Sequence, residues 1–413
     1  MIRIMAVWIV VGWATAVWSA EAVKSGDGKT PEATAGTAAG PWALKDWRYR
    51  VAVDVGASGF ARQDKPAEVE LNFTELLKGL DTAGKFNEES VRAVEVKAGK
   101  ADGEVIPCQF DKAEGYDAAT SAKGIVVFLM PGATAAKSTR RFHVYFETKE
   151  GLPAAKVQPL VTLTDDVDHQ GLKSYKIATP KATYIYQKPA GGFASLLDAQ
   201  GNDWLSYHPG GGPAGEYRGI PNLAHGEGFF HPGGKNCTSK ILSAGPLKVT
   251  IYSESNDQKW KCTWEILPSY ARMTVLACGH PYWFLYEGTP GGNIDNDIDF
   301  CVRSDGTKTP AKQSWDQKLG DPEWVYFGDG KLVRMLFLVH HEHDDGMDSY
   351  WPMNNAMTVF GFGRQGLGKF MTAVPGHFTI GLSDETDFPK ASVVIDSAFR
   401  PLTVRVEKPE KKM

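Results

Sequence analysis

The stretch Val333–Phe362, VRMLFLVHHEHDDGMDSYWPMNNAMTVFGF, constrains the architecture more than any other part of the chain. Two mostly apolar runs, Val333–Val339 and Ala356–Phe362, flank a polar segment. Short apolar runs bounded by turn residues are typical of buried β-strands. The stretch therefore predicts strand, polar loop and strand, and loops held by a sheet often carry binding groups. Three of the ten histidines stand where the first run meets the loop, namely His340, His341 and His343.

Strand patterns also dominate the rest of the chain. Glu68–Phe73 alternates polar and apolar residues with period two. One short helix is predicted at Thr74–Gly79, with Thr74 as its N-cap. Two further strands are predicted at Asp295–Val302 and Ala391–Ile395. Because βαβ alternation and a strict internal repeat are both missing, we predict an all-β fold of antiparallel sheets and not a propeller.

Strand spacing predicts two folded domains in the 413 residues. About six short strands between residues 45 and 150 fit an N-terminal immunoglobulin-like β-sandwich. Pro153 and Pro159 mark a linker. Residues 160–410 are predicted to form a large antiparallel β-supersandwich, because one large sandwich is the simplest arrangement for so many strands.

The first 22 residues have the pattern of a signal peptide. Arg3 precedes the apolar run Ile4–Val17, and Ala20 and Ala22 supply a small-x-small cleavage site. The run is shorter than the roughly 20 residues that span a bilayer. Residues 23–40 are rich in Gly, Ala, Thr and Lys and predict a flexible leader. We expect an exported protein, periplasmic or extracellular, without a membrane span after cleavage.

Composition narrows the class of partner. A net charge of −4 argues against nucleic acid, which requires a basic face. Twelve Trp, fourteen Tyr and twenty Phe suit a glycan binder, and they suit a β-sandwich core equally well. The five cysteines include no C-x-x-C pair, which argues against a thiolate zinc site. Phosphate loops, dinucleotide fingerprints and Gly-x-Ser-x-Gly elbows are also missing from the sequence.

Residues 174–209, SYKIATPKATYIYQKPAGGFASLLDAQGNDWLSYHP, resemble the opening of a galactose-mutarotase-like β-supersandwich. That superfamily shows a strand pair, a Gly-Gly turn, a strand ending in Asp, and Gly-x-Asp/Glu-Trp. The matching segments here are Ala182–Gln187, Gly191-Gly192, Phe193–Asp198 and Gly201-Asn202-Asp203-Trp204. The superfamily includes sugar epimerases, β-domains of glycosidases and several polysaccharide lyases. The resemblance implies a polysaccharide or oligosaccharide partner, and it bears on fold more than on chemistry.

The first polar cluster lies in residues 208–234, where nine glycines and four prolines predict a long loop. Arg218 would hold the carboxylate of a uronic acid, while Tyr217 or His225 would move a proton. His231 would contact substrate. The alternative is a glycine-rich cover whose histidines only satisfy backbone carbonyls.

The second cluster lies in residues 286–300. On the predicted strand Asp295, Asp297 and Asp299 share one face, which would suit a divalent cation such as calcium. The spacing is not that of an EF-hand, and a solvated acidic face is an equal alternative. Glu287, placed on a turn before the strand, is the best carboxylate candidate for acid–base chemistry.

The third cluster is the loop of the opening stretch. His341 and His343 would point to one side of a strand, where two imidazoles could bind a metal ion. His341 could instead transfer a proton, oriented by an aspartate of the loop. Tyr350 and Trp351 would form a stacking platform for sugar, or a packed corner.

These clusters predict a carbohydrate-active enzyme, most simply a lyase acting on a uronic-acid-containing polysaccharide. A glycoside hydrolase using Glu287 with an aspartate and a non-catalytic glycan-binding surface protein are the alternatives. We expect one cleft to be lined by Arg218, His225, Glu287, His341 and His343.

Overall fold

The computed structural model describes residues 42–97, 103–205, 219–224 and 230–413. The all-β prediction is confirmed, because the described chain forms six sheets and only two α-helices. No helix in these ranges is both long enough and apolar enough to cross a membrane. All five cysteines are free. Residues 40–413 cluster as a single unit.

Two sheets enclose a core built largely from residues 49–146. Their strand orders are β27-β1-β7-β3-β4 and β2-β6-β5. The strands are β1 Tyr49–Gly56, β2 Arg62–Asn72, β3 Asn87–Glu95, β4 Val105–Ile106, β5 Cys108–Lys112, β6 Lys123–Thr134, β7 Thr139–Glu147 and β27 Thr403–Lys411. Fully buried Val53, Phe128 and Val144 pack in this core. The immunoglobulin-like assignment of these two sheets stays a prediction.

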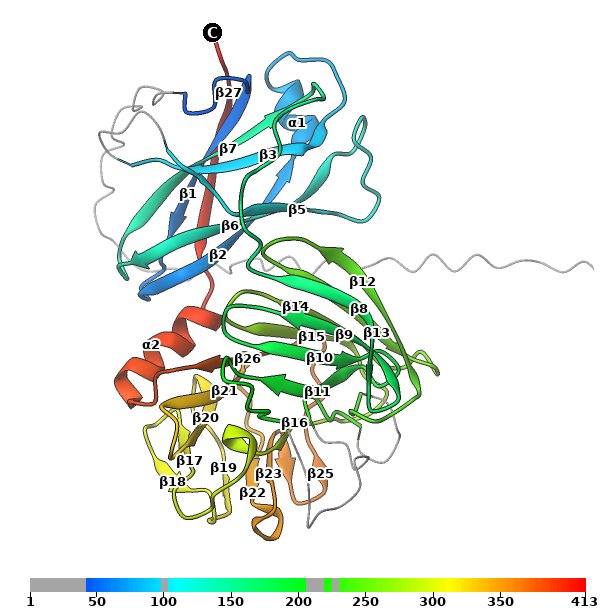
Figure 1. Cartoon of the computed structure of the whole chain (residues 1–413), viewed down its shortest axis with the longest axis vertical. Coiled ribbons are helices and arrows are strands. Elements are labelled where there is room, and N and C mark those ends of the chain that lie inside the picture. Colours follow the sequence, from blue (N-terminus) through cyan, green and yellow to red (C-terminus); the bar gives the residue numbers. More distant parts are fainter. Residues whose placement is uncertain (1–41, 98–102, 206–218, 225–229) are drawn as a thin grey trace, which may run out of the picture. The chain divides into compact units, whose positions relative to one another are not determined.

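The C-terminal strand β27 belongs to this N-terminal sheet. It pairs antiparallel with β1, from Tyr49 opposite Lys411 to Gly56 opposite Thr403, as Figure 1 shows. This strand was not expected from its sequence, because TVRVEKPEK is polar and mostly exposed and its pairing partner lies about 350 residues earlier.

The helix α1, Phe73–Lys78, lies close to its predicted position, but its N-cap was wrong. Asn72, and not Thr74, is the N-cap: its side chain accepts a hydrogen bond from the backbone N–H of Glu75 at 3.3 Å. Both residue types can cap a helix. The pattern alone therefore left the start uncertain by two residues.

Three further sheets surround the main core, which is built from buried residues between Val161 and Leu382. Their orders are β11-β10-β9-β8, β12-β13-β14-β15-β26-β21-β20-β17-β18 and β16-β23-β22-β19, and the hairpin β24-β25 stands apart. The first sheet contains β8 Thr162–His169, β9 Leu172–Ala178, β10 Thr183–Gln187 and β11 Gly192–Leu197. The nine-stranded sheet contains β12 Cys237–Ala244, β13 Val249–Ser255, β14 Lys261–Ile266, β15 Ala271–Ala277, β17 Phe300–Arg303, β18 Lys308–Pro310, β20 Glu323–Asp329, β21 Arg334–His340 and β26 Gly376–Ser383. The remaining elements are β16 Phe284–Gly288, β19 Trp315–Gln317, β22 Asp348–Trp351, β23 Thr358–Phe362, β24 Arg364–Gln365, β25 Gly368–Lys369, and the 3₁₀ turns η2 Pro290–Gly292 and η3 Met353–Asn355.

The sheet β16-β23-β22-β19 packs on one face of the nine-stranded sheet. Phe284 stacks on Phe378 with ring centroids 4.2 Å apart, and Tyr286 meets Phe327 at 5.3 Å. Helix α2, Phe388–Phe399, covers the part of the other face formed by β17, β20 and β21. The predicted strands Val333–Val339 and Ala356–Phe362 are confirmed as β21 and β23.

Helix α2 corrects the prediction of a strand at Ala391–Ile395 (Figure 1). Pro389 in the first turn favours a helix start. Ala391, Ile395 and Ala398, spaced four and three residues apart, are buried against β20 and β21. The β-branched run favoured a strand locally, but the buried face follows the helical period.

The predicted strand Asp295–Val302 is also wrong in its first half. Only Phe300–Arg303 forms a strand, β17, and the preceding residues form turns. The backbone N–H of Asp299 donates to the carbonyl of Asp295 at 2.8 Å, which is a helical-type contact. The aspartates therefore do not share one face of a strand.

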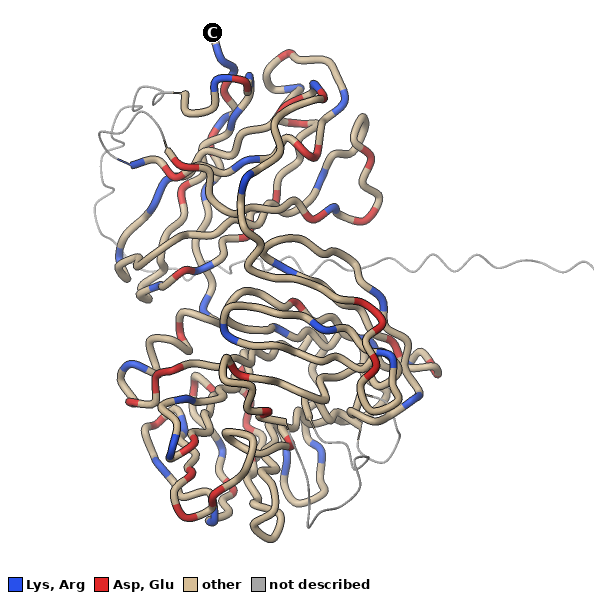
Figure 2. Tube along the Cα trace, viewed as in Figure 1, with Lys and Arg blue, Asp and Glu red and all other residues tan. Residues whose placement is uncertain are grey.

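Charged residues are interspersed along the described chain (Figure 2). One group of charged side chains is enclosed between sheets. Lys248 is only 2% exposed. Its Nζ lies 2.8 Å from Glu68 and 3.0 Å from both Asp111 and Glu265. Arg272 contacts Glu68 at 2.8 Å and Glu265 at 2.6 Å. This group, the Lys248 cluster, joins the sheet β2-β6-β5 to the nine-stranded sheet.

The Lys248 cluster predicts acid-sensitive stability. Burial alone would raise the pKa of Glu68, but Arg272 and Lys248 hold it below its ordinary 4.5, and the pKa of Glu265 is lowered by the same partners. Both carboxylates thus stabilise the fold above pH 4.5, and that contribution is lost as the pH falls below it. We expect the free energy of unfolding, measured by urea titration, to drop between about pH 5 and pH 3.

The strand β2 offers a matched pair of variants for this experiment. Glu68→Gln should flatten the acid decrease, because one fewer proton is taken up on unfolding. Glu70→Gln should leave the slope unchanged, because Glu70 forms an exposed pair with Lys123. Equal slopes in Glu68→Gln and the unmodified protein would contradict the assignment.

Candidate functional site

Glu287 lies on the outer face of the sheet β16-β23-β22-β19. Glu287 of β16 stands opposite Val359 of β23, and Trp351 of β22 stands opposite the same valine on its other side. Residues directly opposite in neighbouring strands point to one face. Glu287, Val359 and Trp351 therefore form a row. The next row, Tyr286, Phe360 and Tyr350, points into the main core.

The carboxylate of Glu287 is held by two side chains, Asn222 and His231, that lie between β11 and β12 in the sequence. It is 7% exposed. Nδ2 of Asn222 donates to its Oε2 at 3.0 Å, and Nε2 of His231 lies 3.3 Å from the same oxygen. The backbone N–H of Glu287 donates to the carbonyl of Gly219 at 3.1 Å. The described residues 219–224 therefore hydrogen-bond to β16, and His231 places an imidazole against a nearly buried carboxylate.

Arg364 supplies positive charge near this pair. It is 8% exposed, and its Nη1 donates to the carbonyl of Val359, the residue opposite Glu287, at 3.3 Å. Burial lowers the pKa of Arg364, and the charge of Glu287 acts against that change. The guanidinium also lies 5.9 Å from the ring centroid of Trp283, which packs in one apolar cluster with Val359.

This arrangement can transfer a proton. Imidazole and carboxylate side chains are the groups that most often act as general acids and bases in enzymes. The exposed Trp351, 41% accessible, offers a flat apolar surface on the same face of the sheet, two strands from Glu287. Aromatic rings with one solvent-exposed face are suited to packing against ligands. The site therefore combines an acid–base pair, a cation and an aromatic surface.

Of the two predicted aromatic contacts to substrate, Trp351 is exposed and Tyr350 is buried. Trp351 is available to ligand, as described above. Tyr350 is 1% exposed, and its hydroxyl donates to the carbonyl of Ala311 at 2.5 Å. For Tyr350 the packed-corner alternative is the correct one, because alternation turns adjacent residues to opposite faces of a strand.

His341 and His343 do not form the predicted pair on one side of a strand. The strand β21 ends at His340. Nε2 of His341 is 2.8 Å from Oγ1 of Thr379, and its ring packs against Phe399 of α2. Burial lowers the pKa of His341 to about 3, which makes it a weak base at neutral pH. His343 is half-exposed and bonds Glu323 instead, with Nδ1 at 3.0 Å.

The prediction of one shared cleft is therefore wrong for His341. His341 lies on the face of the nine-stranded sheet that packs against α2. Glu287 lies on the outer face of the sheet β16-β23-β22-β19, and the main core separates the two. His231, by contrast, is brought to Glu287 from a different cluster of the sequence. Tyr217, Arg218 and His225 lie outside the described residues.

The three aspartates of the predicted calcium site have separate partners. Asp295 pairs with Lys331 at 3.0 Å, and Asp297 pairs with Lys312 at 3.0 Å. Asp299 is buried and accepts the backbone N–H of Gly330 at 2.9 Å. Burial raises its pKa to about 6. Within the described chain these carboxylates do not converge on a common point.

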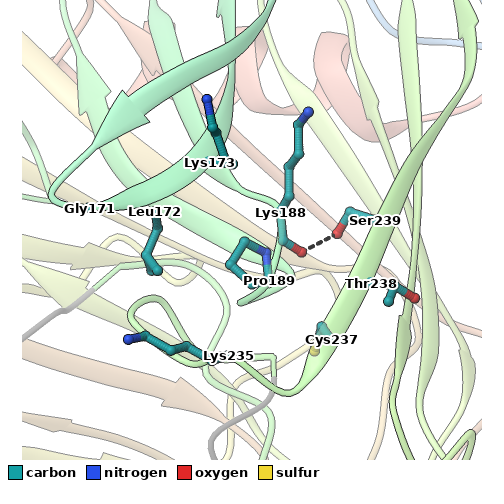
Figure 3. Close-up of a pocket in the computed structure, with 9 residues that line it drawn as sticks. All are labelled: Gly171, Leu172, Lys173, Lys188, Pro189, Lys235, Cys237, Thr238 and Ser239. Atoms are coloured by element: carbon teal, nitrogen blue, oxygen red, sulfur yellow. Dashed lines mark hydrogen bonds between the residues drawn. The ribbon is translucent and has the colours of Figure 1, made fainter.

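A separate groove of about 540 Å³ lies at the edge of the sheet β11-β10-β9-β8 (Figure 3). The ammonium groups of Lys173 and Lys188 point away from that of Lys235, and Lys188 already pairs with Asp166 at 2.6 Å. Burial raises the pKa of Cys237 to about 12, which leaves its thiol protonated. The groove therefore offers no convergent chemistry. Its lining is Gly171, Leu172, Lys173, Lys188, Pro189, Lys235, Cys237, Thr238 and Ser239.

Sequence reasoning missed Asn222 and Arg364. Asn222 stands in an otherwise apolar segment, Ile220–Ala224, where a buried amide is a signal, because buried polar groups need partners. Its Oδ1 is buried without a hydrogen-bond partner. Arg364 follows directly after the apolar run of β23, but nothing in its neighbours indicated that it turns back over the sheet.

No protein-family model and no curated protein matches the sequence. Among solved structures, HI1317 is 10% identical with a TM-score of 0.38, and the match covers 54% of this chain and 99% of that one. The YeaD protein of Salmonella typhimurium, a provisionally assigned mutarotase, is 13% identical with a TM-score of 0.34, covering 51% and 90% respectively. Both are loose likenesses at low identity.

Proposed function

We propose that this chain is a carbohydrate-active enzyme whose Glu287–His231 pair performs acid–base chemistry on a polysaccharide. The observation that carries the proposal is the 3.3 Å contact between the His231 imidazole and the Glu287 carboxylate, in a row with the exposed Trp351. A sugar ring on Trp351 would present its C–H or hydroxyl groups toward this pair. The non-catalytic binder does not require a buried acid–base pair.

Within this class we favour a lyase acting on a uronic-acid-containing glycan. Removing the proton beside a carboxylate needs nearby positive charge to stabilise the anion that forms. Arg364 supports this reaction from among the described residues. Arg218, with Tyr217 and His225, keeps the role predicted from the sequence.

A glycoside hydrolase is the second candidate, with Asp316 of β19 as the second carboxylate. Both Glu287 and Asp316 act electrostatically on Arg364. The strands β16 and β19 are separated by two intervening strands, so their backbones lie about 14 Å apart. Hydrolases need carboxylates about 5–9.5 Å apart. The two side chains would therefore have to extend toward each other across the sheet for a hydrolase mechanism.

The proposal is tested by incubating the purified chain with a panel of uronic-acid-containing and neutral polysaccharides. A lyase produces ultraviolet absorbance from a conjugated double bond. A hydrolase produces new reducing ends without that absorbance. Binding without either product, across the panel, would contradict catalysis and support the glycan-binding alternative.

Trp351→Ala should weaken substrate binding without changing the chemical step. We expect KM to rise about tenfold, equivalent to about 1.4 kcal/mol, with little change in kcat, because Trp351 would contact sugar but not the reacting atoms. Steady-state kinetics on the substrate found in the panel measures both constants. Leu242→Ala is the control, because Leu242 is 50% exposed on β12 of a different sheet. A fall in kcat alone would contradict the stacking role.

A further inference from the structure

A second group of titratable side chains lies where β20 begins and β21 ends. Glu323 is the first residue of β20 and His340 the last of β21, and the two are paired across the strands. Each is 3% exposed. Nδ1 of His340 lies 2.5 Å from Oε2 of Glu323. Two neighbouring strands thus hold a carboxylate and an imidazole side by side in the interior.

The loop after β21 brings two more groups to the same point. Candidate ligand atoms of Glu323, His340 and Asp344 all lie within 4.8 Å of one another. The backbone N–H of Asp344 donates to Oε1 of Glu323 at 2.8 Å, which fixes the loop there. Nδ1 of His343 is 3.0 Å from the same oxygen. Two carboxylates and one imidazole therefore lie close together, and a second imidazole, that of His343, contacts Glu323.

In the part of the chain that the structure describes, the basic partners of Glu323 are imidazoles. Among the described residues, no lysine or arginine forms an ion pair with Glu323 or Asp344. Two carboxylates this close repel each other, and burial of Glu323 increases the cost. A cation between them would remove that cost.

We propose that Glu323, His340 and Asp344, with His343 as fourth ligand, bind a divalent transition-metal ion of the zinc type. Mixed imidazole and carboxylate ligands suit zinc, whereas calcium takes oxygen ligands alone. A tetrahedral zinc ion with bonds of about 2.1 Å separates its ligand atoms by about 3.4 Å. Side-chain adjustments of about 1 Å reach that spacing from the observed positions.

Glu342 and His377 support this assignment as outer partners. Nε2 of His340 lies 3.5 Å from Oε2 of Glu342, and Glu342 is hydrogen-bonded by the ring and the backbone N–H of His377. A metal-binding histidine commonly donates its other ring N–H to a carboxylate. His340 has this arrangement, and its Nδ1, which faces Oε2 of Glu323 at 2.5 Å, is the atom that would bind the ion. The ion would tie the loop 341–347 to the two strands.

The test uses the full chain, treated with chelator and then titrated with zinc chloride by calorimetry. We expect one zinc ion per chain and a rise in the thermal unfolding midpoint, because an ion that binds only the folded state stabilises it. Asp344→Asn should lower the affinity at least about tenfold. Asp345→Asn, an exposed neighbour in the same loop, should leave it unchanged.

Absence of zinc binding at micromolar concentrations would overturn the proposal. Equal loss in Asp344→Asn and Asp345→Asn would overturn it too, because it would mean diffuse attraction to an acidic loop. If Asp344→Asn does not fold, as judged by circular dichroism, the half-exposed His343→Gln replaces it, with the same loss expected. Glu287→Gln should bind zinc normally, so the metal site stands or falls independently of the proposed enzymatic function.

Discussion

Replacing Glu287 by Gln is expected to lower kcat about a thousandfold, within the range that general acid–base groups contribute. The amide has the shape of the carboxylate, but it cannot take up a proton at neutral pH. Its oxygen can still accept the hydrogen bond that Asn222 donates at 3.0 Å, so the fold should persist. Steady-state kinetics and an unchanged unfolding midpoint together measure this outcome.

Two companion variants sharpen the result. His231→Gln should also lower kcat, because the imidazole lies 3.3 Å from the same carboxylate. Asp316→Asn separates the two chemistries: a lyase retains most of its activity, whereas a hydrolase using Asp316 loses as much as with Glu287→Gln. If Glu287→Gln keeps kcat within about threefold, far less than an acid–base group contributes, the proposed role is wrong.

Replacing Lys248 by Met is expected to reduce the free energy of unfolding by about 3–5 kcal/mol. Burial alone would lower the pKa of Lys248, but the charges of Glu265, Glu68 and Asp111 raise it above its ordinary value, so the ammonium stays charged. Methionine fits the space but removes the only group that contacts all three carboxylates. Arg272 remains near two of them, and Asp111 loses its 3.0 Å partner.

Urea unfolding of a matched lysine variant provides the control. Lys181→Met removes a partner of Asp384, but the lysine side chain is 47% exposed and the aspartate 53%. Exposed pairs contribute about 0–1 kcal/mol. The double variant Lys248→Met with Glu68→Gln should lose less than the sum of the two single variants, because the residues share one network. A loss of under about 1 kcal/mol for Lys248→Met, the scale of an exposed pair, would show that the cluster is solvated.

Local patterns in the sequence predicted most of the architecture. The apolar runs around residues 333–339 and 356–362 are strands, as their length and composition indicated. The failures share one cause, which is a local propensity overruled by packing. At residues 391–395 a β-branched run lies in a helix, because its buried face follows the helical period. The polar strand β27 forms because β1 lacks another neighbour on that side.

For the candidate site, the sequence could supply the chemical groups but not their grouping. Glu287, His231 and Trp351 were all candidates from their own local segments. Their proximity depends on the pairing of β16 with β23 and β22, and on the loop that hydrogen-bonds to β16. The same pairing turned Tyr350 into the core. Glu323 was not a candidate, because it meets His340 only through the register of β20 and β21.

The amino-acid sequence by itself determined the all-β class and supplied Glu287, His231 and Trp351 as candidates, since composition and short-range patterns indicate both. Only the tertiary structure decided which of those side chains meet. Strand register and sheet order bring together residues tens to hundreds of positions apart, and a shift of one residue reverses every face. No local pattern encodes that choice. The tertiary structure brings His231 into contact with Glu287, places His341 on another face of the nine-stranded sheet, and pairs the C-terminal strand β27 with β1.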